Sequence, residues 1–544
     1  MNAIATLDGV SVTYPFAGRP AVSEISLQVE PGQLVLLAGP SGCGKSTVMR
    51  VINGLIPNAY RAEVTGTVTV AGKNTNESAI HTISETVGTL LQNPGRQVMG
   101  HSVQADIAFG LENRALPAHV IQARVDGVAS ELGIDDGLMS ASTHELSGGQ
   151  LQLVAFAGVL VTQPRLIVVD EPLANLDPDT ASRTLQAIRE YVDGGGAAIV
   201  IEHRVDELAP FDPDAVIYLE EGRTRYHGDL KGFLRAADPA SVRLPFTTLL
   251  ARAAALSPQQ HPEPTKGTGT VLRYRQAELG YGDSSVIHHA TADFAAGQRI
   301  AVIGPVGAGK STLLRASVGL VDILSGTVEL LGRPVAHYPA VRLATLCGYL
   351  FQNPAQALFA PTVADEVAFG PRNLGKDAAE IETICAHTLH AVGLSDLPAI
   401  MSRLPRTLSF GEQRRLALAA ALALQPSTLI LDEPTAGQDE RSVTHLLDAV
   451  WSLPGVDSVY FITHDVDLAL WRSDRIIVIH DGRIVAAGTP SNIVHDESLW
   501  YAQGGPSGRS ILRESDYVRA ARLSIEPSET IPPPRELARR LAHL

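Results

Sequence analysis

Short apolar segments alternate with longer segments of helical periodicity along most of the chain. The segments at 34–38, 166–169 and 197–201 are strand-sized and built from Leu, Val, Ile and Ala. Each is followed at once by a glycine loop or by acidic residues. Strands that are apolar throughout and end at polar residues are typical of a mainly parallel sheet with helices on both faces. The pattern therefore predicts an α/β fold.

The same motifs occur twice in the same order, which predicts two copies of one structural unit. The recurring motifs keep a nearly constant separation: GPSGCGKST at 39–47 and GPVGAGKST at 304–312, LLQNPGRQ at 90–97 and LFQNPAQA at 350–357, HELSGGQ at 144–150 and RTLSFGE at 406–412, VVDEP at 168–172 and ILDEP at 430–434, and IEHR at 201–204 and ITHD at 462–465.

These repeats divide the chain into two domains, a linker and a tail. We expect the following bounds: a first domain over 1–240, a linker over 241–270, a second domain over 271–500 and a C-terminal tail over 501–544. Residues 257–270 are rich in Pro, Gly and Thr without strand or helix periodicity, which is typical of a linker. Four prolines within 526–535 indicate a loosely ordered tail, with a short helix at 536–544.

Two segments fit the phosphate-loop pattern G-x-x-x-x-G-K-[ST], each between an apolar strand and a helical segment. Backbone N–H groups of such a loop converge on phosphate oxygens at a helix N-terminus. We expect Lys45 and Lys310 to bind the β- and γ-phosphates, and Ser46 and Ser311 to ligate Mg²⁺. A glycine-rich turn with an incidental lysine does not explain two copies in this context. The remaining loop residues predicted to bind ATP are Gly39, Gly42, Gly44, Thr47, Gly304, Gly307, Gly309 and Thr312.

An acidic pair follows the apolar strand of the DEP motif in each copy. Asp170 and Asp432 end their strands, where a nucleotide hydrolase places the carboxylate that orders Mg²⁺. Glu171 and Glu433 come next and are candidates for the general base that polarises the attacking water. A solvated acidic loop is the alternative, but the pair occurs twice after an apolar strand. The sequence therefore predicts two Mg²⁺-dependent ATP-hydrolysing sites.

LSGGQ at 146–150, between the phosphate loop and the DEP strand, resembles the signature of ATP-binding-cassette (ABC) ATPases. The resemblance implies two tandem P-loop NTPase domains, each with a mainly parallel sheet core, an antiparallel β subdomain and a helical signature subdomain. It also implies an intramolecular head-to-tail dimer in which each signature closes over the nucleotide of the other domain. The resemblance implies that Tyr14 and Tyr281 stack on adenine, and that Gln92 and Gln352 contact Mg²⁺ and the attacking water. It implies phosphate contacts by Ser147, Gly149, Ser409 and Gly411. It also implies that Asp177 and Asp439 cross the dimer interface, and that the catalytic residues His203 and His464 contact the γ-phosphate. A core tyrosine and a structural histidine are the alternatives for those residue types.

The second signature departs from the family pattern. It is LSFGE, with Phe410 in place of a glycine and Glu412 in place of a glutamine. A Phe restricts the backbone freedom that a glycine allows, and a carboxylate near a triphosphate adds repulsion. In the first copy, Leu153 replaces the arginine usual in the family, which Arg415 keeps in the second. We expect both sites to hydrolyse ATP, with the Lys310 site the faster.

Composition limits the kind of partner and the location. The chain has 43 basic and 58 acidic residues and a formal net charge of −15, which argues against nucleic acid as a partner. No segment approaches the roughly 18–20 apolar residues that span a bilayer, and the N-terminus lacks the basic and apolar regions of a signal peptide. We expect the chain to stay in the cytoplasm without inserting into the membrane itself.

ABC domains serve membrane transport, translation on the ribosome and DNA repair. Ribosome-bound twin-cassette proteins have a long charged helical linker, and repair proteins carry zinc modules or coiled coils, whereas residues 257–270 are short and rich in Pro and Gly. VQADIAFG at 103–110 and VADEVAFG at 363–370 resemble the helical subdomain of energy-coupling-factor (ECF) importer ATPases. In that group, this segment receives a coupling helix of the transmembrane subunit.

The ECF resemblance implies a motor subunit that lies peripherally on the cytoplasmic side of the plasma or inner membrane. Its partners would be a transmembrane scaffold subunit and a small substrate-capturing membrane subunit. The substrates of the group are B-vitamins, their precursors, or cobalt and nickel ions. A generic ABC importer and a twin-cassette translation factor remain the alternatives.

Overall fold

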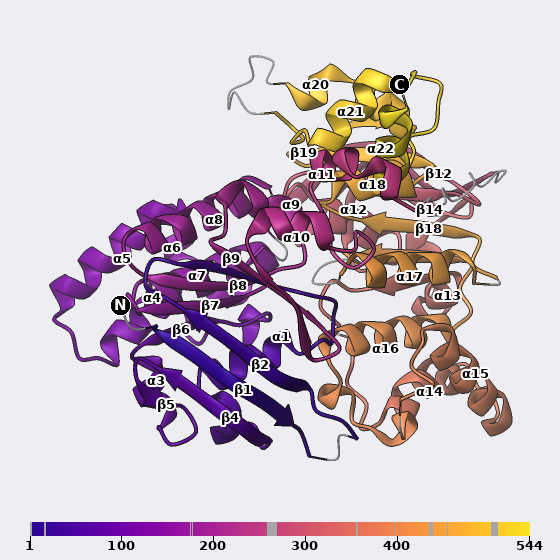
Figure 1. The fold of residues 1–544 in the computed structure, drawn as a ribbon. Coiled ribbons are helices and arrows are strands. Elements are labelled where there is room, and N and C mark those ends of the chain that lie inside the picture. The colour runs from indigo at the N-terminus through magenta and orange to yellow at the C-terminus, as the bar shows by residue number, and fades with distance from the viewer. Residues whose placement is uncertain are drawn as a thin grey trace. The chain divides into compact units, whose positions relative to one another are not determined.

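The chain forms two compact units, one mainly of residues 1–252 and the other mainly of residues 253–544 (Figure 1). The computed structural model describes residues 3–15, 18–173, 176, 178–257, 269–354, 357–397, 399–434, 439–453, 455–501 and 510–543. Each unit contains a six-stranded sheet, a four-stranded sheet and helices. The predicted fold class, two tandem α/β domains, is confirmed.

The first unit follows the predicted alternation of strands and helices. Its strands are β1 (Ala5–Thr13), β2 (Val22–Val29), β3 (Leu34–Ala38), β4 (Glu63–Val70), β5 (Lys73–Asn74), β6 (Val87–Leu90), β7 (Leu166–Asp170), β8 (Ala197–Ile201), β9 (Ala215–Glu220) and β10 (Arg223–Gly228). Its helices are α1 (Lys45–Ile52), α2 (Leu55–Asn58), α3 (Ile80–Ser84), α4 (Val103–Glu112), α5 (Ala118–Leu132), α6 (Asp136–Ser140), α7 (Gly148–Leu160), α8 (Pro178–Asp193), α9 (Val205–Leu208), α10 (Leu230–Ala236) and α11 (Phe246–Ala251).

The second unit repeats this order and adds helices at its C-terminal end. Its strands are β11 (Thr270–Tyr281), β12 (Ser284–Ala295), β13 (Arg299–Ile303), β14 (Asp322–Leu330), β15 (Arg333–Pro334), β16 (Cys347–Leu350), β17 (Thr428–Asp432), β18 (Ser458–Ile462), β19 (Arg475–His480) and β20 (Arg483–Gly488). Its helices are α12 (Lys310–Ala316), α13 (Ala340–Leu346), α14 (Val363–Asn373), α15 (Ala378–Ala391), α16 (Phe410–Leu422), α17 (Glu440–Trp451), α18 (Val466–Arg472), α19 (Pro490–His495), α20 (Glu497–Trp500), α21 (Asp516–Ser524) and α22 (Pro534–Ala542).

The six-stranded sheets have matching topologies, with strand orders β10-β9-β3-β8-β7-β6 and β16-β17-β18-β13-β19-β20. All pairs in them are parallel except β9 with β10 and β19 with β20. Every residue of β3, β7, β8, β13, β17 and β18 is buried, which explains why their sequences are mainly apolar, with polar residues only at the strand ends. Because parallel strands end at one edge, the residues that follow them in each unit lie close together.

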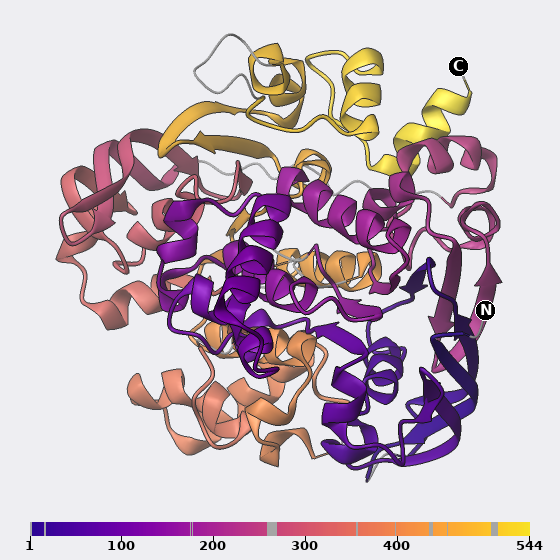
Figure 2. The same cartoon turned by 90° about the vertical axis from the view of Figure 1, so that its left-hand side faces the viewer.

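The four-stranded sheets are antiparallel, in the orders β2-β1-β4-β5 and β12-β11-β14-β15. In β2, buried and exposed residues alternate, so one face packs on the core and the other meets solvent. Figure 2 shows the indigo strands of the first of these sheets from a second side. Helices α4, α5 and α7 contact one another in the first unit, as α14, α15 and α16 do in the second. These are the antiparallel and helical subdomains that the family resemblance implied.

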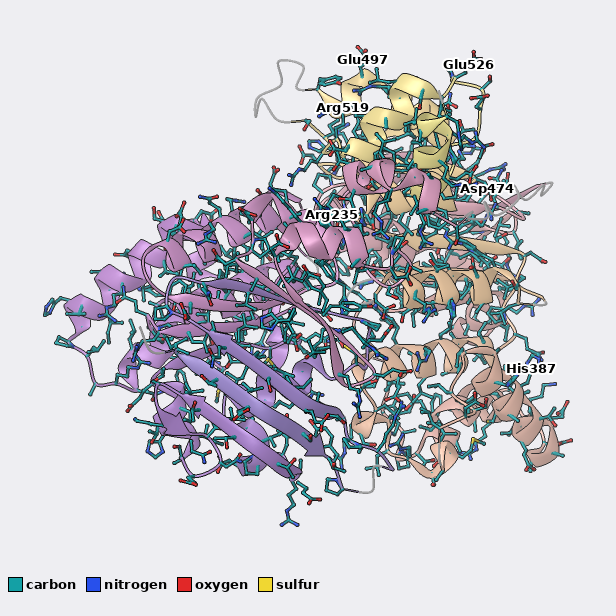
Figure 3. All side chains as sticks on the ribbon, viewed as in Figure 1. Arg235, His387, Asp474, Glu497, Arg519 and Glu526 are labelled. Carbon is teal, nitrogen blue, oxygen red and sulfur yellow. The ribbon has the colours of Figure 1, made fainter. Side chains whose placement is uncertain are left out.

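A buried ion pair fixes the N-terminal end of β13, a central strand of the second unit. Arg299, the first residue of β13, places Nη2 2.6 Å from Oδ1 of Asp474, which Figure 3 labels and which precedes β19. Both side chains are less than a tenth exposed. Arg299 also donates its backbone N–H to Asp474 Oδ2 at 2.8 Å, so the carboxylate aligns the two neighbouring strands.

The predicted linker and the predicted tail both contain packed helices. Within the predicted linker, α11 buries Phe246 and Leu249. In the predicted tail, α21 and α22 bury Tyr517 and Leu537 among other residues, and both helices belong to the yellow end of the chain in Figure 1. The Tyr517 hydroxyl donates to the carbonyl of Pro532 at 2.6 Å. Helix α22 agrees with the short helix predicted at 536–544, whereas α21 and its aromatic burial order a part of the tail that was predicted to be loose. Among the described residues, no helix combines the length and the apolar character needed to cross a membrane.

Candidate functional site

Each phosphate loop connects the buried central strand of its unit to a helix, β3 to α1 and β13 to α12. Gly39 and Gly304 both have a φ of 148°, and a Cβ at Gly39 would lie 2.3 Å from the carbonyl oxygen of Leu219. At Gly304 the corresponding distance to the Ile479 carbonyl is 2.0 Å. Only glycine fits at these positions, so the backbone itself forms the wall of the loop. The other predicted loop glycines also have positive φ: Gly42, Gly44, Gly307 and Gly309.

The loop lysines are buried against their own loops. Lys45 Nζ donates to the carbonyl oxygens of the first two loop residues at 2.7 and 2.9 Å, and Lys310 Nζ does the same at 2.9 and 2.8 Å. Thr47 and Thr312, on the first turn of the following helix, are buried as well. A fixed ammonium group beside a glycine turn and a helix N-terminus suits a polyphosphate. The two loops therefore fit the triphosphate of ATP.

A serine hydroxyl and an aspartate carboxylate lie together beside each loop. Ser46 Oγ donates to Asp170 Oδ2 at 3.1 Å, and Ser311 Oγ donates to Asp432 Oδ1 at 3.0 Å. Hydroxyl and carboxylate oxygens are ligands that Mg²⁺ prefers, so these residues fit a magnesium ion. Within the described part of the chain, no group of three or more His, Cys, Asp and Glu could hold a metal. In a nucleotide site, phosphate and water oxygens would complete the coordination of Mg²⁺.

The glutamate after each aspartate has a strained backbone. Glu171 and Glu433 have φ values of 52° and 49°, in the left-handed region that non-glycine residues rarely adopt. Their N–H groups donate to the carbonyls of Ile201 and Ile462, which end the neighbouring strand, at 2.9 and 3.1 Å. Such strain costs of the order of 1–3 kcal/mol and is concentrated at functional sites. Its occurrence in both units indicates that the turn serves to place the carboxylate.

Each of these glutamates is paired with the histidine at the end of the adjacent strand. His203 Nε2 lies 3.1 Å from Glu171 Oε1, and both side chains are buried. In the second unit His464 Nδ1 lies 3.0 Å from Glu433 Oε2. The histidines are therefore held by the candidate base and do not belong to the apolar core.

The two neighbouring carboxylates of each unit have opposite pKa shifts. Burial, together with the charge of Glu171, raises the pKa of Asp170 to about 7. At Glu171, burial is outweighed by the hydrogen bond and charge of His203, which hold its pKa below the usual value. In the second unit, burial raises the pKa of Asp432, and at Glu433 the neighbouring histidine again outweighs burial and lowers the pKa. The glutamate is thus the carboxylate that stays ionised, as a proton acceptor must.

The loop glutamines and the predicted adenine-stacking tyrosines differ in their contacts between the two units. The Gln92 side chain helps to hold the pKa of Glu171 below its usual value, which places it beside the candidate base. The Gln352 backbone carbonyl accepts from an arginine of α16. Tyr14 packs on the core of the first unit, and its hydroxyl lies 3.2 Å from Thr47 Oγ1. Tyr281 is 49% exposed. Tyr281 is therefore half-exposed, while Tyr14 is partly engaged in its own unit, and adenine stacking by either ring stays a prediction.

The two signatures have the same local structure despite their different sequences. Ser147 caps α7 and Ser409 caps α16, each in a reciprocal capping box with the residue three positions on. Glu412 Oε2 accepts the Ser409 N–H at 2.7 Å, so its carboxylate is engaged at the N-terminus of its own helix. Gly149 and Gly411 are helical.

Neither physical reason for an unfavourable second signature is supported. The position of Phe410 requires only helical backbone angles, since α16 begins there as α7 begins at Gly148. The charge of Glu412 stabilises the start of α16. The expectation that the Lys310 site is faster therefore loses its structural basis.

Of the two predicted interface aspartates, Asp177 lies outside the described residues. Asp439 is buried, and its two carboxylate oxygens accept from the N–H and the hydroxyl of Ser442 at 2.8 and 2.9 Å. The Ser442 contacts form an N-terminal cap for α17. Asp439 Oδ2 also accepts the Ser41 N–H of the first phosphate loop at 2.8 Å, and residues 437–442 group with the first compact unit, so the interface role of Asp439 stays a prediction.

Arg414 of α16 is a functional candidate that motif matching did not single out. Its side chain is completely buried and donates to the carbonyls of Gln352, at 2.9 Å, and Pro434, at 3.2 Å. It thus links the signature helix to the loop glutamine and to the residue after Glu433. In the first unit Gln152 donates to the Glu171 carbonyl at 3.3 Å. The polar residue two positions after each signature was the available sequence signal.

Comparison with known proteins now decides the family. The sequence pattern described as ABC transporter matches residues 22–174 and 287–436. The chain belongs to the ABC transporter family. Its two cassettes are ATP-binding domains that hydrolyse ATP, so the chain is an ATPase, as predicted.

The relatives resemble the chain over nearly its whole length. A protein of Methanosarcina acetivorans is 32% identical over 532 residues, covering 90% of this chain and 86% of its own length. One of Enterococcus faecalis is 34% identical over 538 residues, covering 91% and 92%. Both are provisionally named ABC transporter ATP-binding proteins. A solved structure of cbiO1 from Clostridium perfringens, described as part of the ABC transporter complex cbiONQ, is 28% identical, covers 47% of this chain and 96% of its own, and has a TM-score of 0.39.

Proposed function

We propose that this chain is the ATP-hydrolysing motor of an ECF-type membrane importer that energises uptake of a small nutrient. A B-vitamin, a vitamin precursor or a cobalt or nickel ion is the substrate class that the ECF resemblance favours. The proposed partners are a transmembrane scaffold and a small substrate-capturing membrane subunit. The proposed location is peripheral, on the cytoplasmic side of the plasma or inner membrane.

The observation that carries this proposal is an exposed apolar pair present in both cassettes. Met99 is 72% exposed and Phe109, on α4, is 43% exposed. Phe359 and Phe369, at the corresponding positions of the second cassette, are 67% and 47% exposed, and their rings are 4.8 Å apart in an edge-on arrangement. Large apolar side chains that are exposed at matching positions of both cassettes, and in contact with each other in the second, indicate a protein contact. We call each pair, Met99 with Phe109 and Phe359 with Phe369, a docking pair.

Each docking pair is held in place by a carboxylate of the following helix. Asp106 Oδ1 accepts the N–H groups of Met99 and Gly100 at 2.7 and 2.9 Å. Glu366 Oε2 accepts those of Phe359 and Ala360 at 2.9 and 2.7 Å. A loop whose backbone is fixed while its apolar side chains meet solvent is prepared for a partner.

The chemistry of the partner follows from this surface. Two aromatic or thioether side chains beside a helix suit the apolar face of an amphipathic helix. Two docking pairs suit two such helices, as the cytoplasmic loops of a membrane scaffold would supply. Both pairs come soon after the loop glutamines, so a helix bound there would adjoin the residues that contact the site of hydrolysis.

For the reaction itself, we propose the residue roles that the geometry of each cassette favours. Lys45 and Lys310 bind the phosphates, and His203 and His464 orient the paired glutamates and reach the γ-phosphate. Glu171 and Glu433 accept a proton from the attacking water. Ser46 and Asp170, with Gln92, would hold Mg²⁺ in the first cassette, and Ser311, Asp432 and Gln352 in the second. When bound, Mg²⁺ neutralises charge on the phosphate oxygens.

The test is purification of the tagged chain from detergent-solubilised membranes. Serine at Met99, Phe109, Phe359 and Phe369 should abolish co-purification of a polytopic membrane subunit without changing the nucleotide affinity of the isolated chain. Serine at Leu331 and Leu523, which are 49% and 79% exposed, is the matched control and should not affect it. Retention of the subunit by the docking-pair variant, or co-sedimentation of the wild type with ribosomes, would contradict the proposal.

A further inference from the structure

The second cassette contains a polar cluster around its metal-ordering aspartate. The Tyr349 hydroxyl donates to Asp432 Oδ2 at 2.7 Å, and Arg315 Nη2 lies 3.3 Å from the same oxygen. Arg315 Nε also donates to the Tyr349 hydroxyl at 3.3 Å. Since Ser311 donates to Oδ1, both oxygens of Asp432 accept bonds from the protein. We call Tyr349 and Arg315 the Asp432 clamp.

The clamp follows from the register of two parallel strands. Tyr349 of β16 pairs with Ile430 of β17, and Asp432 is two residues further along β17. Residues two apart in a strand point to the same face, so Tyr349 and Asp432 are diagonal neighbours on one face. Arg315 reaches them from α12, the helix that begins with the phosphate-loop lysine.

The first cassette has the same framework without the clamp. Thr89 pairs with Val168 as Tyr349 pairs with Ile430, but its Oγ1 lies 3.4 Å from Asn53 Nδ2. Arg50, the counterpart of Arg315, donates to the Tyr14 hydroxyl at 3.1 Å and lies over the Tyr60 ring. The Asp170 carboxylate accepts a hydrogen bond from the Ser46 hydroxyl, on Oδ2.

The Asp170 and Asp432 carboxylates therefore differ in how available their oxygens are to a divalent cation. A carboxylate oxygen has about two lone pairs, and on Asp432 Oδ2 both are occupied by clamp donors. The Arg315 guanidinium also places a fixed positive charge beside the carboxylate, which opposes a second cation at this low-dielectric position. We propose that Tyr349 and Arg315 are positioning residues that lower the divalent-cation affinity of the second cassette below that of the first.

The test measures metal binding and does not depend on turnover. Mn²⁺ binding to the full chain with a non-hydrolysable ATP analogue is followed by electron paramagnetic resonance, with Lys310→Ala isolating the first cassette and Lys45→Ala the second. The dissociation constant should be about three- to tenfold higher for the second cassette. Tyr349→Phe and Arg315→Met, each in the Lys45→Ala chain, should lower it toward the value of the first.

A matched variant separates this effect from a general loss of charge. Arg50→Met, in the Lys310→Ala chain, removes the equivalent guanidinium where it does not contact Asp170, and should leave Mn²⁺ affinity unchanged. Tyr349→Phe loses only a hydroxyl, so it remains informative if Arg315→Met does not fold. Equal affinities of the two cassettes, or no tightening in either clamp variant, would overturn the inference.

The inference rests on the proposed metal role of Asp432, which has its own test. Asp432→Asn in the Lys45→Ala chain should weaken Mn²⁺ binding at the second cassette. Unchanged Mn²⁺ binding in this variant would overturn the metal role and the inference with it. Weakened binding here, with no change in the clamp variants, would overturn the inference alone.

Discussion

The imidazole of His203 lies 3.1 Å from the carboxylate of Glu171, measured from Nε2 to Oε1. Both residues come from the ends of adjacent parallel strands, β8 and β7, so the sheet itself brings them together. His464 and Glu433 repeat the pair in the second cassette. The contact keeps a buried carboxylate ionised, because the histidine offsets the cost of burial. Each cassette thus carries its own histidine-paired base.

Replacing the candidate bases should separate hydrolysis from binding. Glu171→Gln with Glu433→Gln should lower the steady-state rate by about 10²- to 10⁴-fold, since a glutamine cannot accept the proton. Nucleotide affinity should persist, because the phosphate loops are untouched. With saturating Mg²⁺, the single variants should each retain part of the rate, with losses of similar size, since both signature helices are capped alike. A much larger loss from one variant would contradict this equivalence.

The histidine pairing predicts a reversal in the pH dependence of stability. The pKa values of Glu171 and Glu433 are lowered on folding, so both residues contribute to the free energy of unfolding at pH values above their unfolded-state pKa. This contribution is lost as the pH falls through their folded-state pKa. In the variant His203→Ala with His464→Ala, burial, which has the largest effect on both carboxylates, should outweigh the remaining charge of the phosphate-loop lysines and raise both pKa values. The contribution should then be lost as pH rises.

Thermal unfolding midpoints of the full chain between pH 4 and 8 measure the slope of stability against pH. Adding Glu171→Gln and Glu433→Gln to the histidine variant should remove the reversed slope, because the titrating groups are gone while other pH effects remain. A slope that is unchanged by the added glutamines would show that the carboxylates are not its source.

The second signature offers a test of its capping box. Glu412→Gln should change ATP hydrolysis little, because a glutamine can also accept the Ser409 N–H and family signatures carry one there. Ser409→Ala removes the cap of α16 and should destabilise the second cassette by about 0.5–2 kcal/mol. Steady-state rates and thermal midpoints distinguish the two. A strong gain in rate from Glu412→Gln would instead indicate that its charge repels the triphosphate.

Sequence alone predicted most of the fold because its signals are local. The apolar segments predicted the buried parallel strands. Gly39 and Gly304, the first glycines of the phosphate loops, lie where a Cβ would collide with a backbone carbonyl. The spacing of Ser46 and Asp170 could not show that they touch, but strands ending at one edge made their proximity an expectation. The Ser-x-x-Glu pattern at 409–412 was a readable capping-box signal, and its interpretation as repulsion missed it.

Other features depend on tertiary packing that no motif encodes. The positive φ of Glu171 and Glu433 arises where the chain turns directly after β7 and β17, and nothing in the residue type indicates it. The burial of Tyr517 in α21 overrode a proline-rich context. The Asp432 clamp required the register of β16 against β17, which sequence periodicity does not supply.

The most direct test of the account is the steady-state ATPase rate of Lys45→Ala combined with Lys310→Ala. The account places hydrolysis at the two phosphate loops, where each lysine is held by the carbonyls of its own loop. The double variant should therefore lose hydrolysis and nucleotide binding while keeping the thermal stability of the unliganded wild type within a few degrees. A double variant that folds and hydrolyses ATP at the wild-type rate would contradict it.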